Sequence, residues 1–130
     1  MIRVKHARPD FVAGCVILAC YFVPLLVSKA EPSTAKIVGL GATRCAQFTS
    51  DVTRNPAMQR DYLAWAQGFM SGILHGRPPG VDEGLDLNPS TFGLLKQLEF
   101  LRDHCAQHPI DGFSNAVEAL YKRLRKENAI

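Results

Sequence analysis

Apolar residues recur along most of the chain at the spacing of α-helices, and this pattern predicts four helices. The strongest signal runs over residues 56–75, where apolar positions form a broad stripe along one side of a helix. Three further helices are expected over residues 43–55, 88–108 and 112–126. No stretch alternates between apolar and polar residues as a half-buried strand does. The pattern therefore predicts an all-α fold, a small bundle of about four helices.

Local signals mark where the helices begin and which residues they bury. Thr43, Asn88 and Asp111 are expected to cap the first, third and fourth helices, since their side-chain oxygens can accept a hydrogen bond from a free backbone N–H group. Pro89 would then occupy the first position of the third helix. The residues expected to face the interior are Cys45, Phe48 and Val52 in the first helix, Phe92, Leu95, Leu98, Leu101 or Arg102, and Cys105 in the third, and Phe113, Val117, Leu120, Tyr121 and Leu124 in the fourth.

The N-terminal segment differs in kind from the rest of the chain. Residues 1–10 hold a basic head, residues 11–27 carry no charge, and residues 28–30 (Ser-Lys-Ala) have small side chains at the first and third positions. This order is typical of a secretory signal peptide covering residues 1–30. An uncleaved inner-membrane anchor formed by residues 11–27 is the alternative. In both cases the domain is delivered outside the cytoplasm, to the periplasm or beyond, and meets a membrane only through this segment.

Removal of residues 1–30 changes how the remaining chain is read. Residues 31–42 are polar and small and are expected to form a flexible tether, followed by a helical domain over residues 43–130. The whole chain has a formal net charge of +3 at pH 7, but residues 31–130 contain eleven lysines and arginines against eleven aspartates and glutamates. No basic stripe remains, and nucleic-acid binding is therefore not expected.

The cysteines divide between the two parts of the chain. Cys15 and Cys20 lie in the apolar leader, whereas Cys45 and Cys105 lie in the domain. In an oxidising compartment, two cysteines in a domain of this size are expected to pair. We therefore predict a Cys45–Cys105 disulfide, which would stabilise the fold by about 4 kcal/mol on the chain-entropy model.

Small residues follow one line of the second helix, where Ala64, Gly68, Gly72 and Gly76 recur every four positions. Because glycine inside a helix costs up to about 1 kcal/mol relative to alanine, the row predicts that another helix packs very closely there. A ligand groove is the alternative. Residues 76–88 then form a long loop rich in proline, glycine and acidic residues, which is expected to be exposed and mobile.

The sequence shows none of the patterns that indicate catalysis. It contains no nucleophile elbow, phosphate-binding loop or paired-carboxylate motif in a recognisable frame, so neither enzyme activity nor a cofactor is expected. His104 and His108 could share one face of a helix, but two histidines beside a disulfide-bonded Cys105 make a weak metal site. No metal is predicted.

Three short motifs resemble the HdeA/HdeB superfamily of small periplasmic helical proteins. Residues 43–48 (Thr-Arg-Cys-Ala-Gln-Phe) are similar to that family's cysteine followed three residues later by phenylalanine, and residues 62–69 are similar to its aromatic second helix. Residues 101–109 resemble its second cysteine with a proline-containing turn before the last helix. The Rap/Tai immunity proteins of type VI secretion share this architecture and carry a Gly-x-x-x-Gly helix like residues 68–72.

The resemblance implies a non-enzymatic domain that binds another protein in one of two roles. As a periplasmic acid-stress chaperone, it would loosen when acid protonates its carboxylates, and its apolar helix faces would bind unfolded clients. As an immunity protein, it would neutralise one specific secreted toxin, with residues 76–88 inserted into that partner. The candidate partner-binding residues are Tyr62, Trp65, Phe69, Arg77, Asp82, Glu83 and Asp86.

Overall fold

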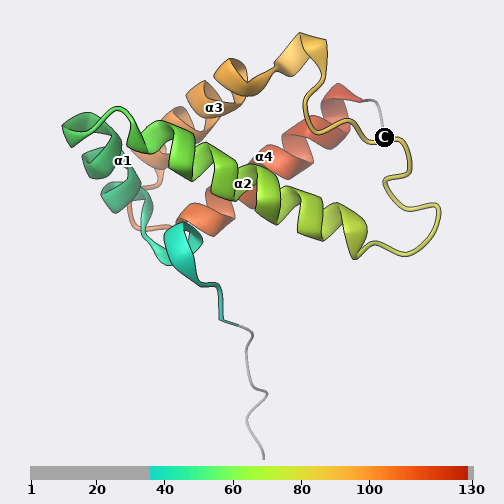
Figure 1. Cartoon of the computed structure of the whole chain (residues 1–130), viewed down its shortest axis with the longest axis horizontal. Helices are drawn as coiled ribbons and strands as arrows, with labels where there is room; N and C mark the ends of the chain where they lie inside the picture. The colour runs from blue at the N-terminus through green and yellow to red at the C-terminus, as the bar shows by residue number, and fades with distance from the viewer. Residues whose placement is uncertain (1–35, 129–130) are drawn as a thin grey trace, which may run out of the picture. The chain divides into compact units, whose positions relative to one another are not determined.

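A computed structural model describes residues 36–128, which form four α-helices and two short 3₁₀ turns (Figure 1). Their bounds are η1 (Gly39–Ala42), α1 (Cys45–Arg54), α2 (Met58–His75), η2 (Ser90–Phe92), α3 (Leu94–Gln107) and α4 (Phe113–Glu127). Within these residues the β-structure is a single isolated bridge between Arg44 and Gly112. The predicted all-α fold of four helices is confirmed.

The segment interpreted as a signal peptide or anchor lies outside the described residues, as do residues 31–35 of the expected tether. Between residues 36 and 128, no helix is both long and apolar enough to cross a membrane. Residues 34–130 form one compact unit.

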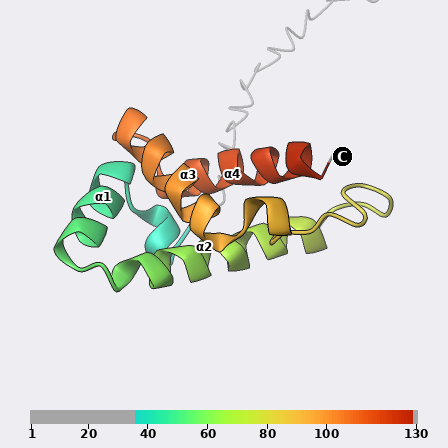
Figure 2. The same cartoon turned by 90° about the horizontal axis from the view of Figure 1, so that it is seen from above.

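The core lies where α4 meets the other three helices, each of which it contacts. All the residues predicted to face inward from α1 and α4 are buried. At the centre, the rings of Phe48, Tyr62 and Phe113 come from three different helices and lie with their centroids 4.8 to 4.9 Å apart. Such close aromatic packing stabilises a core beyond the area that it buries. α1 lies at one end of this arrangement, and the loop between α2 and η2 lies at the other (Figures 1 and 2).

The predicted disulfide joins Cys45, the first residue of α1, to Cys105 near the end of α3. Both residues are buried, and 60 positions separate them in the sequence. The bridge therefore closes a loop that contains the whole of α2 and the long connection to α3.

The N-terminus of α1 is capped by backbone carbonyls and not by Thr43. The N–H groups of Cys45 and Ala46 donate to the carbonyl oxygens of Asp111 (2.8 Å) and Pro109 (2.9 Å), which belong to the turn before α4. The Thr43 hydroxyl donates instead to the Leu40 carbonyl, at 2.7 Å. Tertiary partners thus satisfy the free N–H groups that usually require a side-chain cap. The predicted Thr43 cap is wrong for this reason.

The predicted caps of the later helices are also wrong. α3 begins at Leu94 after Gly93, because residues 90–92 form the separate turn η2. The buried amide of Gln97 fixes this break, since its Nε2 donates to the carbonyl oxygens of Leu87 (2.9 Å) and Phe92 (3.0 Å). At α4 the cap position is held by Gly112, one residue after the expected Asp111.

Residues 39–42, expected to belong to the flexible tether, instead form η1 and pack on the helices. η1 contacts α2 and α4, and Gly41 is buried against the indole ring of Trp65. A Cβ atom on Gly41 would lie 1.9 Å from Cζ2 of that ring, so only glycine fits there without displacing the indole. The folded domain therefore begins before residue 43.

The glycine row of α2 does not mark a close helix contact within the described part of the chain. A Cβ atom added to Gly68 or Gly72 would meet no atom within 4 Å, and both residues are exposed. The predicted close packing is wrong because α2 turns its opposite side, with Tyr62, Ala66 and Met70, toward the core.

Candidate functional site

An apolar groove lies between the first half of α2 and the first half of α3. It has a cavity volume of about 440 Å³ and is lined by Pro56, Ala57, Gln59, Arg60, Leu63, Leu94, Leu95 and Leu98. Leu95 is 84% exposed and Leu94 is 41% exposed. Two neighbouring leucines on a helix surface, beside two further half-buried leucines, form a contiguous apolar patch of the kind that marks an interaction site.

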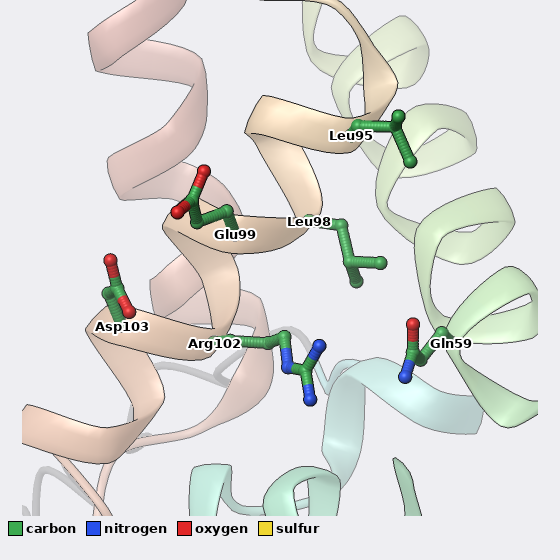
Figure 3. A pocket seen from close by; sticks show the side chains of 6 residues that line it. All are labelled: Gln59, Leu95, Leu98, Glu99, Arg102 and Asp103. Carbon is green, nitrogen blue, oxygen red and sulfur yellow. The ribbon is translucent and has the colours of Figure 1, made fainter. Parts of the chain in front are cut away.

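A second hollow of about 430 Å³ continues the groove along α3 (Figure 3). It shares Gln59, Leu95 and Leu98 with the first and adds Glu99, Arg102 and Asp103. In Figure 3, Leu98 and Arg102 extend from α3 toward Gln59 on α2, while the carboxylates of Glu99 and Asp103 point away from Gln59. Including Arg60, the lining has two cationic and two anionic side chains around an apolar floor. An apolar centre with a charged rim is the usual anatomy of a protein interface.

The exposure of Leu95 contradicts the prediction that it faces the core. The prediction followed a row of residues spaced three apart, Phe92, Leu95, Leu98 and Leu101. Each step of three falls about 60° short of a full turn of an α-helix, so Leu95 lies about 120° around the helix from Leu101. The buried line of α3 instead runs through Gln97, Leu101 and Cys105. The groove therefore differs from the expectation from the sequence, although the drift of a three-residue row around the helix indicates that Leu95 leaves the buried side.

Tyr62 lies in the core, where a partner cannot reach it in this fold. It is completely buried, and its hydroxyl donates to Asp51 at 2.8 Å. Asp51 also accepts hydrogen bonds from Gln47 (2.6 Å) and Arg54 (2.7 Å). The Tyr62 hydrogen bond, joined by those two donors, outweighs desolvation and lowers the pKa of Asp51 below its ordinary value. Of these contacts, the Tyr62 hydrogen bond joins α2 to α1, while those of Gln47 and Arg54 lie within α1.

Trp65 and Phe69 lie together on α2 and are half-buried. Their rings are stacked, with centroids 4.9 Å apart, and Trp65 also lies 6.0 Å from Phe113. Trp65 covers Gly41 of η1 as described above. This pair therefore supports the docking of η1 on one side of α2, and it is separate from the groove lined by Leu63 and Leu95.

The predicted loop residues separate into a buried anchor and exposed neighbours. Asp82 is 3% exposed and has a positive φ of 59°, whereas Glu83 and Asp86 are exposed. Asp82 accepts a hydrogen bond from the Tyr121 hydroxyl at 2.8 Å. Its carboxylate oxygens also lie 2.6 Å from Arg125 Nε and 3.2 Å from Arg77 Nε.

These contacts keep Asp82 ionised in spite of its burial. Desolvation opposes the charged form, but the Tyr121 hydrogen bond and the two guanidinium groups outweigh it, so the pKa of Asp82 is lowered. Leu85 of the same loop is buried as well, and Asn128 binds the backbone of Asp86 through both its oxygen (3.3 Å) and its nitrogen (3.1 Å). The loop that was expected to be exposed and mobile is thus anchored by Asp82 to Tyr121 and Arg125 of α4 and by Asp86 to Asn128, the residue after α4.

The two histidines at the end of α3 lie close together, with ring centroids 4.7 Å apart. Burial, followed by the proximity of His108, lowers the pKa of His104. Across residues 36–128, no group of three or more histidine, cysteine, aspartate or glutamate side chains is arranged to hold a metal ion.

Comparison with known proteins identifies no relative of this chain. No protein-family model, curated protein or solved structure matches the chain. The function must therefore be argued from the groove, the anchored loop and the chemistry of their residues.

Proposed function

We propose that the protein is an exported, non-enzymatic binding domain that holds an apolar segment of another protein in the groove between α2 and α3. The observation that carries this proposal is the exposure of Leu94 and Leu95 beside the half-buried Leu63 and Leu98. Burying one leucine side chain fully contributes about 1.5–3 kcal/mol. A partner that covers both exposed leucines would gain a substantial part of a micromolar affinity, about 8 kcal/mol, from them alone.

The folded state is the binding state in this proposal. The groove is open while the disulfide and the aromatic core are intact, so no unfolding is required to reach it. This agrees best with the immunity-type role implied by the resemblance to the Rap/Tai proteins, in which one specific partner is held at neutral pH in the periplasm.

The acid-stress chaperone is a second candidate, favoured by Asp51 and Asp82. Both carboxylates have a pKa lowered by folding. Each therefore stabilises the fold above its unfolded pKa, about 3.9, and this stabilisation is lost as the pH falls through the lower folded-state value. Acid would weaken the hydrogen bond between Tyr62 and Asp51 and release the loop from α4, exposing Leu85, while the disulfide and the aromatic core keep α1 packed on α2.

Site-directed photo-crosslinking distinguishes these roles in the exported protein. A photo-reactive residue replaces Leu95, and the matched control replaces Ile110, which is 78% exposed and does not line the groove. We expect one discrete adduct from position 95 at neutral pH and none from position 110.

Other outcomes have defined meanings. Many adducts that form from position 95 only below about pH 4 would favour the chaperone. An equal adduct yield from positions 95 and 110 would contradict any role for the groove.

A further inference from the structure

We propose that a separate pocket, between the end of α2 and α4, binds a carboxylate group. The pocket has a cavity volume of about 260 Å³ and is lined by Ile73, Arg77, Glu118, Tyr121, Lys122 and Arg125. Pockets for drug-sized ligands are larger, about 300–1,000 Å³. The volume therefore suits a small anion or a single side chain and not a cofactor.

The two arginines of the pocket are held in place by Asp82, which does not line the pocket. The buried carboxylate of Asp82 faces Nε of Arg125 at 2.6 Å and Nε of Arg77 at 3.2 Å. The Arg77 guanidinium also lies over the ring of Tyr121, 5.7 Å from its centroid. In each ion pair the contact to Asp82 is made by Nε, on the inner edge of the guanidinium, and the terminal nitrogens lie further out along the side chain. A guanidinium fixed in this way presents the planar donors that match a carboxylate.

The charges of the pocket favour one anionic group. Arg77, Lys122 and Arg125 contribute three positive charges, and Asp82 and Glu118 contribute two negative charges. Lys122 is exposed and forms no ion pair with another described residue. A single excess positive charge is complementary to one carboxylate, whereas a doubly charged phosphate would remain partly uncompensated.

Nuclear magnetic resonance titration of oxidised residues 31–130 at neutral pH and low salt tests this site. The probes are N-acetylglycine, which carries one free carboxylate, and a short peptide with blocked termini whose single charged residue is a glutamate, compared with the same peptide carrying glutamine. We expect saturable shifts of the Tyr121, Lys122 and Arg125 amide signals with a carboxylate probe. Binding of both probes would indicate that a small carboxylate suffices, and binding of the glutamate peptide alone would indicate an acidic side chain of a polypeptide.

Matched variants separate the pocket from general charge attraction. Lys122→Gln should weaken binding about tenfold, the effect of losing one charge-assisted hydrogen bond. Lys126→Gln removes the same charge from α4 outside the pocket and should leave the affinity unchanged. Absence of saturable shifts, equal binding of the glutamine peptide, equal weakening by Lys126→Gln, or tighter binding of inorganic phosphate would each overturn the proposal.

Discussion

The two ends of the domain are held together by different kinds of contact. At the α1 end, the Cys45–Cys105 disulfide and the rings of Phe48, Tyr62 and Phe113 form a buried, mainly apolar cluster. At the loop end, a buried carboxylate, Asp82, holds the chain through a tyrosine hydroxyl and two arginines. Apolar packing and a covalent bond respond little to pH, whereas a buried ionic cluster is lost when its carboxylate is protonated. The domain therefore combines one permanent end with one that conditions can release.

Removing the disulfide should lower the free energy of unfolding more than any other change. Cys45→Ser with Cys105→Ser opens a loop of 60 positions, and the chain-entropy model predicts a loss of about 4 kcal/mol in the free energy of unfolding. Urea denaturation of the variant and of the oxidised wild type measures the loss. An unchanged midpoint would show that the α1 end does not depend on its covalent bond.

Gly41→Ala should produce the next largest effect. The new Cβ atom would overlap the Trp65 ring and force it away from its stack with Phe69, so the loss in stability should be about 2 kcal/mol, as for other overpacked sites. Gly68→Ala is the matched control, because its Cβ atom meets open space on a helix. That variant should gain up to about 1 kcal/mol, and thermal unfolding of both would reveal the opposite signs. A loss at Gly68 would mean that its side of α2 is covered after all.

Asp82→Asn should loosen only the loop end. The variant removes the charge that pairs with Arg77 and Arg125, so amide hydrogen exchange over residues 78–88 should accelerate at neutral pH while exchange in α1 stays the same. The wild type should show this acceleration only in acid, below about pH 3.9, because its lowered pKa keeps Asp82 ionised above that value. Acceleration across the whole domain would contradict the separation of the two ends.

Leu95→Ala should have the smallest effect on stability. The side chain is 84% exposed, and surface substitutions usually change the free energy of unfolding by less than about 0.5 kcal/mol. Leu101→Ala, on the buried line of the same helix, should cost about 3 kcal/mol. Chemical denaturation of the two variants checks which side of α3 faces the core. Similar losses in the free energy of unfolding at both positions would place Leu95 in the core.

The faces of α1 and α4 could be predicted from the sequence because their apolar residues keep a full helical period. Phe113, Val117, Leu120 and Leu124 follow steps of four and three, and all are buried. The disulfide followed from the number of cysteines and the expected compartment.

Other features depend on contacts between distant residues, which no local pattern contains. Asp82 lies in a loop whose proline and glycine content suggests exposure. It is nevertheless buried, and it accepts a hydrogen bond from Tyr121, 39 positions further along the chain. The start of α3 depends in the same way on Gln97, which binds carbonyl groups of the preceding loop. The groove could not be predicted because the apolar residues of α2 and α3 that line it are expected, from their spacing, to face the interior.

The most direct test of the proposed groove is apolar-dye fluorescence on oxidised residues 31–130, recorded with near-ultraviolet circular dichroism from neutral pH to about pH 2. The account predicts dye binding at neutral pH with the tertiary signal intact, reduced by Leu95→Asp and unaffected by Ile110→Asp. Dye binding that appears only as the tertiary signal is lost, and equally in both variants, would contradict a binding groove in the folded domain.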